Sequence, residues 1–209
     1  MTRRKKRAKK TFIFIFIVTL VFGVLLYFIL FDKNSGVLVK SKYEIPKYGY
    51  TLDRNNTVLM KESFNELKDI LTSDTVDYDK YALTLAKLFI IDLYTLDNKK
   101  NMYDIGSVEY VYDKENFKNR CQSTIYRFLK DESKRLSGQL PIVESIEIVD
   151  TKTDKFEYNE NSYDSYVISL SWSYKKDMGY DTKGIVQIIN IEDKLYVVSY
   201  DAKESLWNI

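Results

Sequence analysis

Histidine is absent from this 209-residue chain, and cysteine occurs once, as Cys121. Histidine is the commonest general base and the commonest metal ligand, so its absence narrows the catalytic and metal-binding chemistry that we expect. A single cysteine excludes an intrachain disulfide, so an exported domain would be held together by its core alone. Neither a glycine-rich nucleotide loop nor acidic residues at calcium-loop spacing stand out. We therefore predict no catalytic residue, no metal site and no cofactor.

The longest hydrophobic run covers residues 12–31, twenty residues without a charge. A helix rises about 1.5 Å per residue, so this run is long enough to cross the roughly 30 Å hydrocarbon core of a bilayer. Phe and Ile alternate at its start, but a lone strand in lipid would leave its backbone groups unsatisfied. We predict a transmembrane helix at residues 12–31 that contacts the lipid bilayer.

Residues 1–11 contain seven Lys and Arg residues and no acidic residue. Such a cationic flank is retained in the cytoplasm, which places residues 32–209 outside the membrane. A cleaved signal peptide is the alternative, but its apolar region is shorter, about 7–15 residues, and it ends in a small-residue cleavage site. We predict an uncleaved signal anchor in a single-pass protein of the cell membrane, with a cytoplasmic N-terminus and an outer C-terminal domain.

The outer part of the chain is acidic. Seven of the 32 basic residues precede the predicted span, which leaves 25 against 30 acidic residues and a formal charge of −5 for residues 32–209. Contacts to phosphate need clustered cations, so we expect no nucleic acid bound to the outer domain. The basic tail is expected to orient the chain, and binding of nucleic acid or anionic lipid is the less favoured alternative for it.

Residues 32–48 are mixed and polar and predict a linker before an outer domain at residues 49–209. Apolar residues at helical spacing then predict three helices, and a switch to alternating apolar and polar residues predicts strands. The helices are expected at 58–71, 78–96 and 114 to about 135, with Asn56 or Thr57, Asp77 and Asp113 as N-caps. The strands are expected at 105–112, 142–149, 166–174, 185–191 and 195–200, with a tight turn at 192–194. Helices followed by antiparallel strands indicate the α+β class.

This order of elements resembles the nuclear-transport-factor-2-like superfamily over roughly residues 50–205. Behind a single N-terminal anchor, it also resembles the membrane-anchored assembly components of bacterial type IV secretion and conjugation channels, although the Asn-Pro motif common in those components is absent. The resemblance implies about three helices packed on a curved, cone-shaped antiparallel sheet. It also implies a non-catalytic binding or assembly function at the bacterial cell envelope, with a protein partner or a second copy of the chain.

Asp92 is the one candidate site residue. On a wheel of about 100° per residue it lies inside the apolar stripe of the second helix, between Leu85, Leu88 and Leu96. A buried carboxylate has to be paired, hydrogen-bonded or protonated. Enzymes of the resembled superfamily place an acid in the cavity of the cone, so Asp92 is a candidate acid for a small-ligand sensor or a cavity enzyme. The alternative, which we favour, is a structural hydrogen bond to a tyrosine, a lysine or a strand amide.

Three further features leave alternatives open. Cys121 falls on the apolar stripe of the third helix, which favours a buried thiol over a reactive one. Tyr43, Tyr48 and Tyr50 are expected to be residues at the edge of the core, with a binding surface for a partner as the alternative. Serines at alternate positions in 169–173 give one strand face that is neither charged nor strongly apolar, which is compatible with dimerisation through the sheet.

Overall fold

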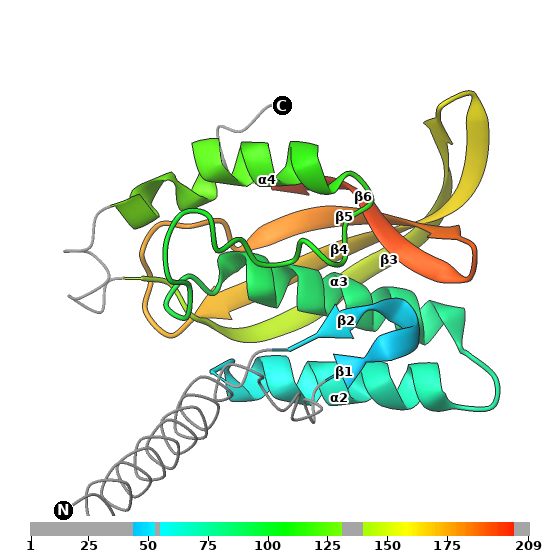
Figure 1. The fold of residues 1–209 in the computed structure, drawn as a ribbon, viewed down its shortest axis with the longest axis horizontal. Helices are drawn as coiled ribbons and strands as arrows, with labels where there is room; N and C mark the ends of the chain where they lie inside the picture. The colour runs from blue at the N-terminus through cyan, green and yellow to red at the C-terminus, as the bar shows by residue number, and fades with distance from the viewer. Residues whose placement is uncertain (1–43, 53–54, 131–139, 203–209) are drawn as a thin grey trace, which may run out of the picture. The chain divides into compact units, whose positions relative to one another are not determined.

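A computed structural model describes residues 44–52, 55–130 and 140–202. The predicted tail, the predicted span and most of the predicted linker lie outside the described residues. Among the residues that are described, no helix is long and apolar enough to cross a membrane. The described part contains three α-helices and antiparallel sheets (Figure 1), which confirms the predicted α+β class.

The three helices are α2 (Val58–Thr72), α3 (Tyr78–Tyr94) and α4 (Lys114–Ser123). Each begins at a predicted N-cap, because the side-chain oxygens of Thr57, Asp77 and Asp113 accept a hydrogen bond from the backbone N–H three residues on, at 3.1–3.2 Å. The third helix was expected to run to about residue 135. It ends earlier because Thr124 leaves the helical conformation, and the chain continues as the 3-10 helix η3 (Ile125–Lys130).

Four strands form one antiparallel sheet in the order β3-β4-β5-β6. Their bounds are β3 (Val143–Tyr158), β4 (Asn161–Tyr174), β5 (Lys183–Ile191) and β6 (Lys194–Ala202). The two-residue turns at 159–160 and 192–193 have positive φ angles between 48° and 64°, as tight hairpins require. Four of the five predicted strands are confirmed, but β3 is longer than expected: it pairs with β4 along its whole length and reaches residue 158.

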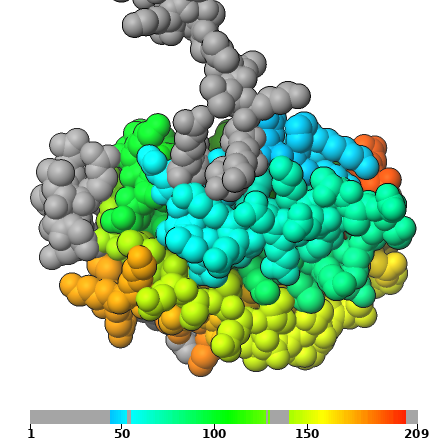
Figure 2. All heavy atoms as spheres, turned by 90° about the horizontal axis from the view of Figure 1, so that it is seen from below, coloured from blue at the N-terminus to red at the C-terminus, as the bar shows by residue number. Residues whose placement is uncertain are grey.

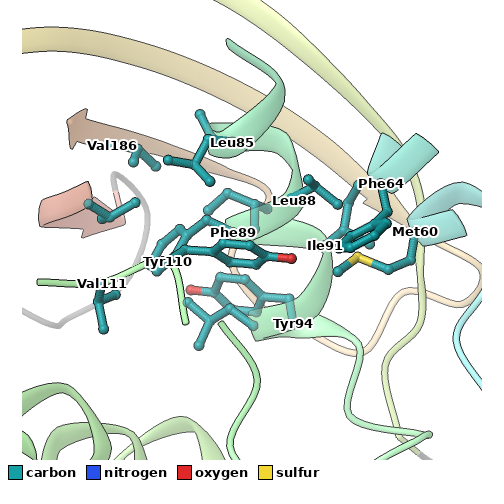
Figure 3. Close-up of a cluster of buried hydrophobic side chains, with 14 of the residues drawn as sticks. Met60, Phe64, Leu85, Leu88, Phe89, Ile91, Tyr94, Tyr110, Val111 and Val186 are labelled. Carbon is teal, nitrogen blue, oxygen red and sulfur yellow. The ribbon is translucent and has the colours of Figure 1, made fainter. Parts of the chain in front are cut away.

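Helix α3 lies across the sheet and forms the centre of the core (Figure 1). It contacts all four strands and buries eleven of its 17 residues. Helix α2 packs against α3, and Figure 3 shows Met60 and Phe64 of α2 beside Ile91 of α3. The broad apolar stripe seen in the sequence is therefore explained by burial on two sides, against α2 and against the sheet.

The expected strand at residues 105–112 is wrong. This segment forms turns, and a single parallel bridge joins Val111 to Val197 of β6. Contacts with α3 outweigh the strand preference of its side chains: Gly106 packs against the helix backbone, and Ser107 adopts a positive φ of 63°. The segment is therefore fixed to α3 and meets the sheet only at its end.

The end of the predicted linker belongs to the domain. Residues 44–51 form the hairpin of β1 (Glu44–Ile45) and β2 (Tyr50–Thr51) around the 3-10 helix η2 (Pro46–Tyr48). Tyr48 and Tyr50 are buried, so both belong to the core, whereas Tyr43 lies outside the described residues. The Tyr50 hydroxyl lies 2.6 Å from that of Tyr81 and donates to the carbonyl of Leu195 at 3.2 Å. The hairpin is therefore tied to α3 and to β6.

Candidate functional site

A cavity of about 590 Å³ lies between α3, the α4–η3 segment and β6. Its apolar wall includes Phe117, and its polar groups include Arg120 of α4 and Asp181 of the loop between β4 and β5. Pockets that bind small molecules have about this size and combine an apolar wall with a few placed polar groups. The cavity is therefore the first candidate for a functional site in the described part of the chain.

A chain of hydrogen bonds runs along one side of this cavity. The Tyr94 hydroxyl donates to Oδ2 of Asp181 at 2.9 Å and lies 2.8 Å from the Tyr200 hydroxyl, which therefore donates to Tyr94. The Tyr174 hydroxyl donates to the carbonyl of Asp181 at 2.6 Å. Burial raises the pKa of all three tyrosines above the ordinary value. They stay neutral at physiological pH and hold the Asp181 loop in place.

Cys121 also lines the cavity, but its chemistry is that of a core residue. The side chain is buried, and this burial raises the pKa of the thiol to about 12, although the charge of Arg120 acts in the opposite direction. A thiol reacts as a nucleophile only in its deprotonated form, which is scarce at neutral pH for such a group. The prediction of a buried Cys121 is confirmed.

Asp92 does not belong to the residues that line this cavity. Its Oδ1 atom lies 2.5 Å from Nζ of Lys99, and its Oδ2 atom accepts a 2.5 Å hydrogen bond from the backbone N–H of Ser107. The side chains of Asp92 and Lys99 are 15% and 8% exposed. Gly106 is packed against Asp92, since a Cβ atom there would lie 2.3 Å from the Asp92 carbonyl oxygen. We call Asp92, Lys99, Gly106 and Ser107 the Asp92 latch.

The latch joins α3 to the turns that follow it. A lysine and a backbone amide are partners of the kind expected for a structural acid, although the amide comes from a turn and not from a strand. The carboxylates that line the described cavity are those of Asp181 and Asp201, which the sequence did not single out. A ligand-binding role for Asp92 stays a prediction, and the described geometry favours the structural alternative.

Glu109 is a second titratable group that sequence reasoning missed. Its carboxylate accepts hydrogen bonds from the backbone N–H of Thr51 at 3.1 and 3.2 Å and from its hydroxyl at 3.2 Å. Burial raises the pKa of Glu109 to about 7, and the negative charge of Asp92 adds to this rise. The sequence around Glu109 contains only a run of β-forming residues and does not indicate a buried acid. The contact that defines its environment is with Thr51, 58 positions away.

Metal binding finds no support in the described ranges, where no three Cys, Asp or Glu side chains are grouped as metal ligands. No family model matches the chain, and no curated protein or solved structure matches it either. The resemblance to the nuclear-transport-factor-2-like superfamily therefore stays a prediction from the order of elements. The function has to be inferred from the geometry of the domain.

Proposed function

We propose that the protein is a single-pass membrane protein whose outer domain binds a partner at the bacterial cell envelope without catalysing a reaction. The observation that supports the non-catalytic part of this proposal is the cavity between α3, α4 and β6, whose thiol and tyrosine hydroxyls all have raised pKa values. A general base or nucleophile needs a pKa near the working pH, so these groups suit binding better than catalysis. A role as an accessory of a secretion or conjugation channel belongs to the same proposal and is supported by the order of elements.

The second candidate is a receptor for a small ligand, and the size of the cavity favours it. A ligand that fits has an apolar body that packs against Phe117 and polar groups that meet Arg120 and Asp181. In this case the cavity itself is the site. In the first case the domain surface binds another protein, and the cavity need not be filled.

The proposed topology is tested by labelling intact cells with a thiol reagent that does not cross membranes. We compare Glu160→Cys, at the exposed turn between β3 and β4, with Thr2→Cys in the predicted cytoplasmic tail. Labelling is expected only at position 160, and the wild-type chain gives little background because Cys121 is buried. Labelling only at position 2 would reverse the proposed orientation.

The two binding functions are separated by filling the cavity. Ser199 is exposed and lines it, so Ser199→Trp places a large ring there, whereas Ser173→Trp puts the same ring on an exposed position of β4 outside the lining. We compare both variants with the wild type by crosslinking in native membranes and by mass spectrometry of small molecules that copurify with the protein.

Recovery of the same protein partner from all three chains supports the assembly function. A small molecule that copurifies with the wild type and with Ser173→Trp but not with Ser199→Trp, without any protein partner, supports the receptor instead. Recovery of neither a partner nor a ligand contradicts both.

A further inference from the structure

Strand β3 is an open edge of the sheet. It pairs with β4 on one side, and no backbone hydrogen bond from the described residues reaches its other side between residues 144 and 158. Figure 2 shows β3 as a yellow-green band of open surface next to the helices. The backbone N–H groups of Thr151 and Lys155 donate to the neighbouring side chains of Asp150 and Asp154. A 16-residue edge is long, and such edges are templates for pairing with another strand.

The first half of β3 is acidic, whereas the second half carries charges of both signs. Glu144 and Glu147 lie in the first half, and Lys152 and Lys155 lie in the second half among three acidic residues (Asp150, Asp154 and Glu157); all seven side chains are exposed. Strand β4 does not neutralise the inner pair, because Glu147 lies opposite Ser171 and Lys152 lies opposite Val167. The lysines form exposed ion pairs within the chain, with Asp150 at 3.2 Å and Asp164 at 2.6 Å. Exposed pairs of this kind are weak and exchange readily.

A β-bulge divides the two halves. The register between β3 and β4 shifts between Ile148 and Asp150, so Val149, which is 66% exposed, is an extra residue. Because of this insertion, Ile148 and Thr151 lie on the same face of the sheet, opposite the buried Leu170 and Ile168 of β4. Glu147 and Lys152 share the other face for the same reason.

The bulge makes the edge complementary to itself. When a second copy is rotated by a half turn about an axis through Val149 and Asp150, Ile148 meets Thr151 of the copy, and Glu147 meets Lys152 of the copy. Both pairs then lie on matching faces, as antiparallel pairing requires. The same register places Glu144, the extra residue of a second register shift between Val143 and Ser145, opposite Lys155, and symmetry repeats each Glu–Lys pair.

We infer that β3 pairs with β3 of a second copy of this chain, antiparallel and centred on Val149–Asp150. Two four-stranded sheets then join into a single continuous sheet. The pairing satisfies the outward backbone groups of both edges, forms four Glu–Lys cross-strand pairs and covers the half-buried side chains of Ile146 and Ile148. The inference is independent of the proposed binding function of the cavity.

The register is tested with single cysteines in the full chain, oxidised in the membranes of expressing cells and separated on non-reducing gels. Val149→Cys lies beside the two-fold axis, so we expect a disulfide-linked product of twice the 24.7 kDa chain mass. Glu157→Cys is the matched control, because it is exposed on the same strand but lies roughly 50 Å from its own copy in this register. It should give no dimer, and neither should the wild type, whose Cys121 is buried.

The charge pattern is tested in the Val149→Cys background. Glu147→Lys and Lys152→Glu each convert two attractive pairs into two repulsive ones, so each is expected to reduce the crosslinked fraction roughly tenfold. The combination of both substitutions restores the attraction and is expected to restore the crosslink. All of these side chains are exposed, so the thermal midpoint of each variant should stay close to that of the wild type.

Three results would overturn the inference. The first is that Val149→Cys gives no crosslinked dimer, and the second is that Glu157→Cys gives as large a crosslinked fraction as Val149→Cys. The third result is a charge-swapped double variant whose crosslinked fraction is as low as that of the single substitutions. A crosslinked product of any mass other than twice that of the chain would show that a different protein occupies the edge.

Discussion

Substitution of Asp92 by Asn tests whether the latch is a structural device. The change removes the negative charge but keeps an oxygen that can accept the hydrogen bond of Ser107. Lys99 is then left with its positive charge at 8% exposure and no carboxylate at 2.5 Å. Removal of one partner of a buried ion pair costs about 3–5 kcal/mol, and we expect the lower end because Asp92 is 15% exposed.

The loss is measured by thermal unfolding of the purified full chain, followed by the near-ultraviolet circular dichroism of its tyrosines. For a chain of this length, about 3 kcal/mol lowers the midpoint by roughly 6–12 °C. Asp97→Asn is the matched control, because it removes the same charge from an exposed position near the end of the same helix. We expect it to shift the midpoint by less than about 2 °C.

The double variant Asp92→Asn/Lys99→Met tests whether the unpaired charge of Lys99 causes the loss of stability. Methionine removes the uncompensated ammonium group and keeps an apolar stem, so we expect it to restore at least half of the lost stability. The reasoning is refuted if Asp92→Asn lowers the midpoint of thermal unfolding no more than Asp97→Asn does. It is also refuted if the double variant is less stable than Asp92→Asn. A variant that folds with normal stability but loses all biological activity would instead support a catalytic or ligand-binding role for Asp92.

Three further predictions concern the same domain. The pKa of Glu109 rises from 4.5 to about 7 on folding, so the folded chain binds more protons between these values, and its stability falls as the pH rises through this window. The full pKa shift corresponds to a change of up to ~3 kcal/mol in the free energy of unfolding. Glu109→Gln should abolish this pH dependence when urea unfolding is measured between pH 4 and 8. A pH profile identical to that of the wild type would contradict the prediction. Gly106→Ala should lower the free energy of unfolding by at least about 2 kcal/mol, since its Cβ atom would collide with the Asp92 carbonyl oxygen, and a neutral effect would exclude the latch geometry. Glu160→Gly should raise this free energy by about 0.5–1 kcal/mol because φ is 64° there, whereas Glu157→Gly, inside the strand, should lower it.

The parts of the fold that the sequence predicted well depend on local signals. Thr57, Asp77 and Asp113 cap helices through bonds to residues three positions away, and the turn at 192–193 connects adjacent strands. Such contacts are encoded within a few neighbouring residues, so a single sequence suffices to find them. The same holds for the apolar stripe of α3, because its period reports burial whichever elements cover it.

The errors arise where distant contacts decide. The β-formers of residues 105–112 suggested a strand, but the packing of Gly106 against Asp92 fixes them as turns. The second half of β3 has charged and exposed residues on both faces, so it shows no alternation, and only its pairing with β4 makes it a strand. Asp181 was missed because its partner Tyr94 is 87 residues away. A stripe in the sequence located Asp92, but no pattern named Lys99 and Ser107 as its partners.

The bond between Tyr50 and Leu195 has a consequence for the order of folding. It joins residues 145 positions apart, and Lys194 likewise donates to the Tyr48 carbonyl at 2.5 Å. During synthesis of the chain, the hairpin of β1 and β2 therefore cannot form these two hydrogen bonds until β6 has been made. Contacts of such long separation slow folding and leave apolar surface exposed in the meantime. A chain halted before residue 194 would lack the hydrogen bonds that Leu195 makes with Tyr50 and Tyr81 and that Lys194 makes with the Tyr48 carbonyl, so the side of the hairpin that these residues cover would stay open.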